Sequence, residues 1–176
     1  MKLKIRRGRQ HKPDFFCVGG SGTLIFQTLA TFRRLALPAV KRAIELASSV
    51  GIPTHIHSCG PEAALVKIMA EETALTVIDP LEIPPMGDCN LAELKRHYGR
   101  QVTFVGGIDS QFVLDKPGVT PDEVRAEVRR RIGELAGGGG YVAAPSHGVP
   151  YRPELIAAMN EEIATCGRNC YAAAES

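Results

Sequence analysis

The sequence predicts an α/β protein in which parallel strands alternate with helices. Five short apolar segments start near residues 15, 52, 75, 102 and 141, and each is followed by a segment that can form a helix. The starts are on average about 31 residues apart, which is the length of one strand-plus-helix unit. Strands that alternate with helices in this way are parallel, so functional residues are expected at their carboxyl-terminal ends.

The composition is that of an ordinary globular chain. Of the 176 residues, 44% are hydrophobic and 23% are charged, and no apolar run is long enough to span a membrane. The 21 basic and 19 acidic residues leave a net charge of +2, which favours neither a nucleic-acid nor a membrane partner. Five cysteines without a signal peptide indicate a reducing, cytoplasmic location, where a cysteine is a ligand, a nucleophile or a core residue.

Three parts of the chain are distinguished by composition. Residues 1–13 contain six basic residues ahead of Pro13 and are expected to form an exposed basic arm. Residues 14–166 are expected to form the α/β domain, and residues 167–176 a frayed tail.

The first strand is expected over residues 15–18 and runs into a glycine-rich loop. Backbone N–H groups of such a loop can bind an anion, so Ser21 and Gly22 are candidate cofactor-binding residues. A plain tight turn explains the glycines equally well. After a connection rich in Phe and Leu, Pro38 is expected to open a helix, and the second strand follows at residues 52–59.

The later elements carry clearer start and stop signals. The third strand, 75–78, leads into a loop whose three prolines force an extended course. Asn90 and Glu93 are a plausible capping pair for a helix over residues 91–98, and Thr120 with Glu123 forms a strong start signal for another. The helix after Thr120 is expected to place its arginines mostly on the solvated side, namely Arg125, Arg129, Arg130 and Arg131.

A possible metal site lies at the end of the second strand. His57 and Cys59 are two residues apart, and alternate residues of a strand share a face, so the imidazole and the thiol point into the same space. His147, at the end of the fifth strand, is the best third ligand for zinc, and Glu82 is the second choice. The alternative is that Cys59 is buried packing and His57 a hydrogen-bonded core histidine.

Asp109 stands at another strand end. It follows two glycines and could orient a polar group of a substrate. It could equally cap the turn that follows.

Five ordered pieces of the sequence resemble the C-terminal half of the uroporphyrinogen decarboxylase (URO-D) superfamily. They are His57-Ser58-Cys59-Gly60, residues 79–88, Leu94-Lys95 with Tyr98-Gly99, residues 106–109 and residues 139–148. Residues 20–23 and 37–38 also look like that superfamily, so the resemblance covers nearly everything after the arm.

The resemblance implies a TIM-type (β/α)₈ barrel of which this chain supplies about five of the eight units. One branch of the superfamily removes carboxylates from uroporphyrinogen without a cofactor. The other branch transfers a methyl group from a methylated corrinoid protein to a thiol, using zinc held by a His-x-Cys pair and a later cysteine. His57 and Cys59 match the pair, and His147 stands at the position of the later cysteine.

The resemblance therefore implies zinc-dependent methyl transfer, with His57, Cys59 and His147 as the metal ligands. Glu82 and Asp109 are the candidate catalytic residues, and the expected partners are a methylcorrinoid protein and a small thiol acceptor. Two alternatives are decarboxylation of a tetrapyrrole substrate and a non-catalytic half-barrel that serves as an assembly unit. Five units leave two open sheet edges, so pairing with a missing N-terminal half or with another copy is expected.

Overall fold

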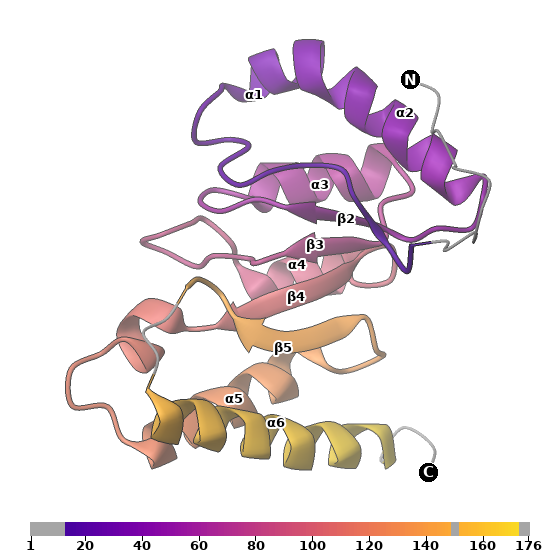
Figure 1. Cartoon of the computed structure of the whole chain (residues 1–176). Coiled ribbons are helices and arrows are strands. Elements are labelled where there is room, and N and C mark those ends of the chain that lie inside the picture. The colour runs from indigo at the N-terminus through magenta and orange to yellow at the C-terminus, as the bar shows by residue number, and fades with distance from the viewer. Residues whose placement is uncertain (1–12, 149–151, 173–176) are drawn as a thin grey trace.

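The computed structural model describes residues 13–148 and 152–172. Five parallel strands form one sheet in the order β1-β2-β3-β4-β5, and helices separate them along the chain (Figure 1). The predicted alternation of five parallel strands with helices is confirmed. The basic arm predicted over residues 1–13 lies, except for Pro13, outside the described residues.

The first half of the chain builds three strands, β1 (Phe16–Cys17), β2 (Thr54–His57) and β3 (Val77–Asp79). Its helical segments are α1 (Leu29–Thr31), the π-helical η1 (Phe32–Ala36), α2 (Leu37–Ser48) and α3 (Ala63–Glu72). The structure is thus helical from Leu29, where the sequence predicted a connection as far as Pro38. The reason is local, because the Thr28 side chain accepts a hydrogen bond from Thr31 N–H and caps a new helix there.

The second half contains α4 (Leu91–Tyr98), β4 (Thr103–Ile108), the π-helical η2 (Ser110–Leu114), α5 (Pro121–Leu135), β5 (Tyr141–Pro145) and α6 (Pro153–Ala172). Both predicted helix caps are present. Asn90 accepts from Glu93 N–H, and Thr120 and Glu123 form a reciprocal capping box. Helix α6 continues to Ala172, beyond residue 166 where the domain is predicted to end, and residues 173–176 of the predicted tail lie outside the described residues.

The strand order equals the sequence order, which is the arrangement of a barrel wall. Burial alternates along β2, where Thr54 and Ile56 are fully buried and His55 and His57 are half-buried. One face of the sheet is therefore covered and the other is accessible. The fold is an arc of parallel α/β structure consistent with a partial TIM-type barrel.

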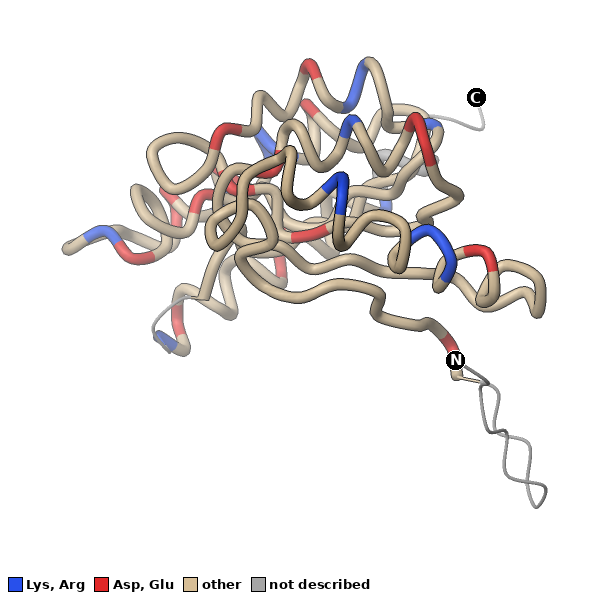
Figure 2. The backbone as a smooth tube through the Cα atoms, turned by 90° about the horizontal axis from the view of Figure 1, so that it is seen from above, with Lys and Arg blue, Asp and Glu red and all other residues tan. Residues whose placement is uncertain are grey.

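Basic and acidic residues are interspersed along the backbone (Figure 2). Arg125 and Arg129 of α5 form ion pairs with Glu161 and Glu162 of α6. Arg131 does not lie on the solvated side as predicted: it is 4% exposed and pairs within α5 with carboxylates one turn away on either side. In the described part of the chain, no helix has the length and apolar character needed to cross a bilayer.

Gly106 is required where β4 passes the turn after β3. Its φ is +117°, and a Cβ there would lie 1.9 Å from the carbonyl oxygen of Pro80. We expect Gly106→Ala to lower the free energy of unfolding by about 3 kcal/mol, because backbone strain and overpacking add. Gly133→Ala is the control in urea denaturation: its Cβ has open space in α5, so it should stabilise by about 0.5–1 kcal/mol. A Gly106→Ala protein as stable as the wild type would contradict this close approach.

The capping box makes stability depend on pH through Glu123. Its hydrogen bonds with Lys116 and Thr120 lower the pKa of Glu123 to about 2. A carboxyl whose folded pKa is depressed contributes stability above its unfolded pKa and loses it as the pH falls toward the folded value. Glu123→Gln should therefore be less stable than the wild type at pH 7 in urea denaturation, and the difference should shrink steadily between pH 4.5 and 2.

The matched control is Glu93→Gln at the same position of α4. Within the described part of the chain, the Glu93 carboxylate has no recorded hydrogen bond or ion pair. This control should show no comparable change with pH. An equal pH dependence in both variants would contradict the assignment to Glu123.

Candidate metal centre

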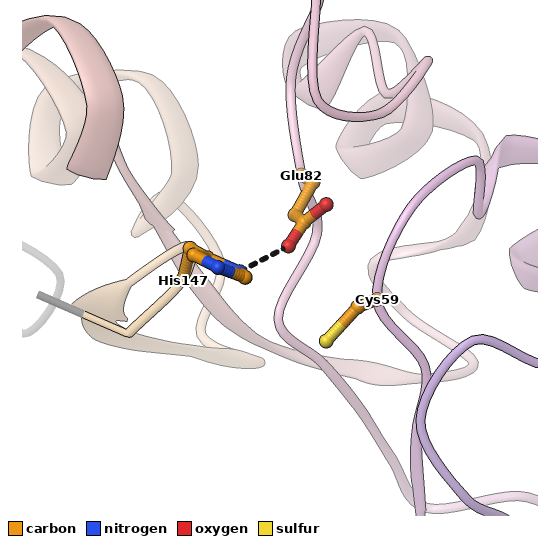
Figure 3. A group of neighbouring side chains, drawn as sticks. All are labelled: Cys59, Glu82 and His147. Atoms are coloured by element: carbon orange, nitrogen blue, oxygen red, sulfur yellow. Dashed lines mark hydrogen bonds and ion pairs between the residues drawn. The ribbon is translucent and has the colours of Figure 1, made fainter.

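Three strand ends bring a sulfur, a carboxylate and an imidazole together. Cys59 follows β2 by two residues, Glu82 follows β3 by three, and His147 follows β5 by two. One ligand atom from each side chain lies within 4.8 Å of the other two. The three side chains converge from separate segments on one space (Figure 3). The sheet thus assembles a cluster from residues far apart in the sequence.

The carboxylate of Glu82 is held from two sides. Its side chain is 3% exposed. Gly60 N–H donates to Oε2 at 2.8 Å, and Nδ1 of His147 lies 2.7 Å from Oε1 in a hydrogen bond. Gly87 leaves room for the backbone here, because a Cβ at that position would lie 2.3 Å from the Glu82 carbonyl oxygen.

Cys59 has two polar neighbours. The Ser21 hydroxyl donates to its Sγ at 3.1 Å, and Nε2 of His57 lies 3.4 Å from the same sulfur. Ligand atoms around one tetrahedral zinc are roughly 3.5 Å apart, because the bonds are about 2.0–2.3 Å long. The His57–Cys59 pair therefore has ligand spacing, although His57 lies outside the group of three that contains Glu82 and His147.

Asp79 orients the histidines of β2. Its Oδ1 lies 3.0 Å from Nδ1 of His57 and 2.7 Å from Nε2 of His55. An ionised carboxylate only accepts, so in the neutral tautomer that donates from Nδ1 of His57 to Asp79 the Nε2 lone pair faces Cys59. Asp79 pairs with His57 in the β2–β3 register, so its position at a strand end was the signal that could have identified it.

The other predicted site residues lie in different settings. Gly22 has a φ of +72°, and a Cβ there would contact the Phe26 ring at 2.5 Å, so this glycine shapes the loop that carries Ser21. Asp109 accepts a hydrogen bond from Phe112 N–H at 2.8 Å and caps η2, which is the second of its two predicted roles. Asp109 also lines a pocket beside Glu82 and His147.

Sequence reasoning missed Glu62, which is fully buried and hydrogen-bonded to the turn that carries Glu82. Burial raises the pKa of this carboxyl to about 8. Its Oε2 accepts hydrogen bonds from the backbone N–H groups of Leu81 and Glu82. Nothing in the sequence distinguishes Glu62 from a solvent-exposed glutamate at the start of a helix.

The donor set fits a transition-metal cation such as zinc. Thiolate sulfur, imidazole nitrogen and carboxylate oxygen are the three ligand types that protein zinc sites use. The hydrogen bond between His147 and Glu82 contains a proton that a cation bound by both would displace, so binding is expected to release protons.

The comparisons with known proteins agree with this architecture. The family model "Uroporphyrinogen decarboxylase (URO-D)" matches residues 24–165. The chain is also similar to uroporphyrinogen decarboxylase of Neisseria meningitidis serogroup C / serotype 2a, at 34% identity over 61 residues, which are 35% of this chain and 16% of that protein. The match thus covers well under two thirds of the relative. The family model spans far more than half of this chain. The chain therefore belongs to the uroporphyrinogen decarboxylase family, a family of enzymes.

Proposed function

We propose that this chain carries the metal-binding part of a methyltransferase site that moves a methyl group from a methylated corrinoid protein to a small thiol. One observation supports the proposal above all: Cys59, Glu82 and His147 offer ligand atoms within 4.8 Å of one another at the strand ends. Zinc bound there would keep an acceptor thiol as its thiolate near neutral pH, although a free thiol has a pKa of about 8.5.

The residues around the cluster have positioning roles in this proposal. Asp79 holds the His57 ring with Nε2 toward Cys59, which is how a carboxylate behind a metal-binding histidine acts. Ser21 donates to the Cys59 sulfur and orients it. Glu82 ties the loop after β2 to His147.

The adjoining pocket is the proposed place of the acceptor. Glu82 and His147 line it together with Asp109, Phe112 and Ser146. One carboxylate oxygen of Asp109 accepts a hydrogen bond from Phe112 N–H. The other oxygen is proposed to contact the acceptor thiol molecule. This is the catalytic role that the sequence suggested for Asp109.

Decarboxylation of a tetrapyrrole is the second candidate, favoured by the similarity to a uroporphyrinogen decarboxylase. A substrate with several carboxylates needs cationic side chains. The described residues that line the pocket include the carboxylates of Glu82, Asp109 and Asp115 and no lysine or arginine. The part of the pocket wall that this chain supplies is therefore acidic, and a cationic surface for a tetrapyrrole would have to come from outside it.

The described sheet has two outer strands, β1 and β5, each paired with one neighbour. A parallel edge of this kind exposes unpaired N–H and C=O groups, and proteins usually cover it. We propose that a further half of the barrel or a second copy of this chain covers these edges. A non-catalytic assembly unit is the third reading.

Metal binding tests the leading proposal. The purified full chain should bind one zinc per chain, measured by elemental analysis, with the affinity determined by competition with a chelator. Cys59→Ser and His147→Ala should each lower the zinc affinity by about 100-fold or more, since each removes a ligand. The control is Cys17→Ser, which changes an exposed cysteine of β1 and should leave the affinity unchanged.

Two other outcomes would contradict methyl transfer. A metal-free protein that converts uroporphyrinogen would support decarboxylation. A protein that takes up neither zinc nor a porphyrinogen and only forms oligomers would support the assembly unit.

A further inference from the structure

Glu62 has a fully buried side chain on the loop after β2, and its carboxyl accepts hydrogen bonds from the turn after β3. It is the residue before α3, three positions after Cys59. Its Oε2 accepts from Leu81 N–H at 2.8 Å and from Glu82 N–H at 3.3 Å. It therefore satisfies two consecutive backbone donors in the turn that presents Glu82.

That turn needs an external support. Leu81 has a φ of +60°, the one positive φ recorded for a non-glycine residue among those described. A left-handed conformation at such a residue costs about 1–2 kcal/mol and persists only where the surroundings enforce it. Leu81 is also fully buried, so its N–H group must find a protein acceptor. Glu62 supplies that acceptor.

Each of the two glutamates has a carboxyl that accepts hydrogen bonds from the backbone of the loop carrying the other. Glu62, on the loop after β2, holds the backbone of Glu82, while the Glu82 carboxylate accepts from Gly60 N–H on the loop that carries Glu62. Cys89 N–H fixes the Glu82 carbonyl at 3.1 Å. With the backbone fixed, the remaining freedom of Glu82 is in its side-chain torsions.

The two carboxyl oxygens of Glu62 differ in their hydrogen bonding. Its Oε1 is buried with no hydrogen-bond partner among the described residues. A buried polar atom in that state costs about 1–3 kcal/mol; an apolar side chain would avoid this cost but would leave the Leu81 and Glu82 N–H groups without their acceptor. The gain must therefore lie in what the other oxygen holds.

We propose that Glu62 is a positioning residue for the metal centre. It fixes the backbone of Leu81 and Glu82 so that the Glu82 carboxylate reaches Gly60 and His147 at the same time. The effect on zinc binding rests on the proposed function, whereas the effect on the Glu82–His147 hydrogen bond does not.

A double-mutant cycle on the full chain tests this proposal. Glu62→Leu removes both acceptor interactions and should lower the zinc affinity about 10- to 100-fold, the usual effect of losing a group behind a ligand. Glu62→Gln keeps an acceptor oxygen and should stay within about 3-fold of the wild type. Because Glu62 acts through Glu82, Glu62→Leu should cause no further loss of affinity in the Glu82→Gln background.

Two results would overturn the proposal: an unchanged zinc affinity in Glu62→Leu, or losses that add in the double variant. If Glu62→Leu does not fold, Glu62→Asp takes its place. Its carboxyl is one methylene shorter and cannot reach both N–H groups, so about a 10-fold loss is expected. A folded Glu62→Asp protein with wild-type affinity would also overturn it.

The metal-free protein gives an independent readout. The ¹⁵N chemical shifts of the His147 ring report its hydrogen bond to Glu82. Glu62→Leu, or Glu62→Asp, should change these shifts in the direction that Glu82→Gln does. Unchanged shifts would contradict the role of Glu62 whether or not the wild type binds zinc. Changed shifts in a protein that binds no zinc would mean that the proposed function alone has failed.

Discussion

The candidate site depends on the hydrogen bonds made by the buried carboxylate of Glu82. Taking a carboxylate out of water is costly unless its oxygens are hydrogen-bonded. One oxygen accepts a hydrogen bond from Gly60 N–H, and the other is hydrogen-bonded to His147. The carboxylate therefore connects the loops after β2 and β5 to the turn after β3. Moving any of the three strand ends would leave a buried acceptor without its partner. The same interactions that satisfy Glu82 also bring the Cys59 sulfur and the His147 imidazole together.

The shape of the sheet explains why these residues remain accessible. The sequential strand order leaves one face of the arc uncovered, and the half-buried residues of β2 and β3 lie on it. His57 and Asp79 sit on this face at the carboxyl ends of their strands, and the cluster continues from there to Glu82. The site therefore lies at the carboxyl ends of the strands, on the accessible face of the sheet.

Much of the fold could be predicted because its signals are local. The capping residues Asn90 and Thr120 fixed two helix starts, and period-two spacing placed His57 beside Cys59. The membership of Glu82 and His147 in one cluster depends on strand twist and loop course, which the sequence allowed but did not determine. Glu62 and Arg131 were missed for a related reason: their burial is set by long-range packing, and a charged residue on a helix is usually solvated.

The proposed site requires a single cation bound by the Cys59 sulfur together with imidazole and carboxylate ligands. X-ray absorption at the zinc edge, on the zinc-loaded chain without added thiol, measures this directly. We expect one sulfur neighbour at about 2.3 Å and nitrogen or oxygen neighbours at about 2.0–2.2 Å. A zinc ion with no sulfur neighbour, or with two or more, would contradict it.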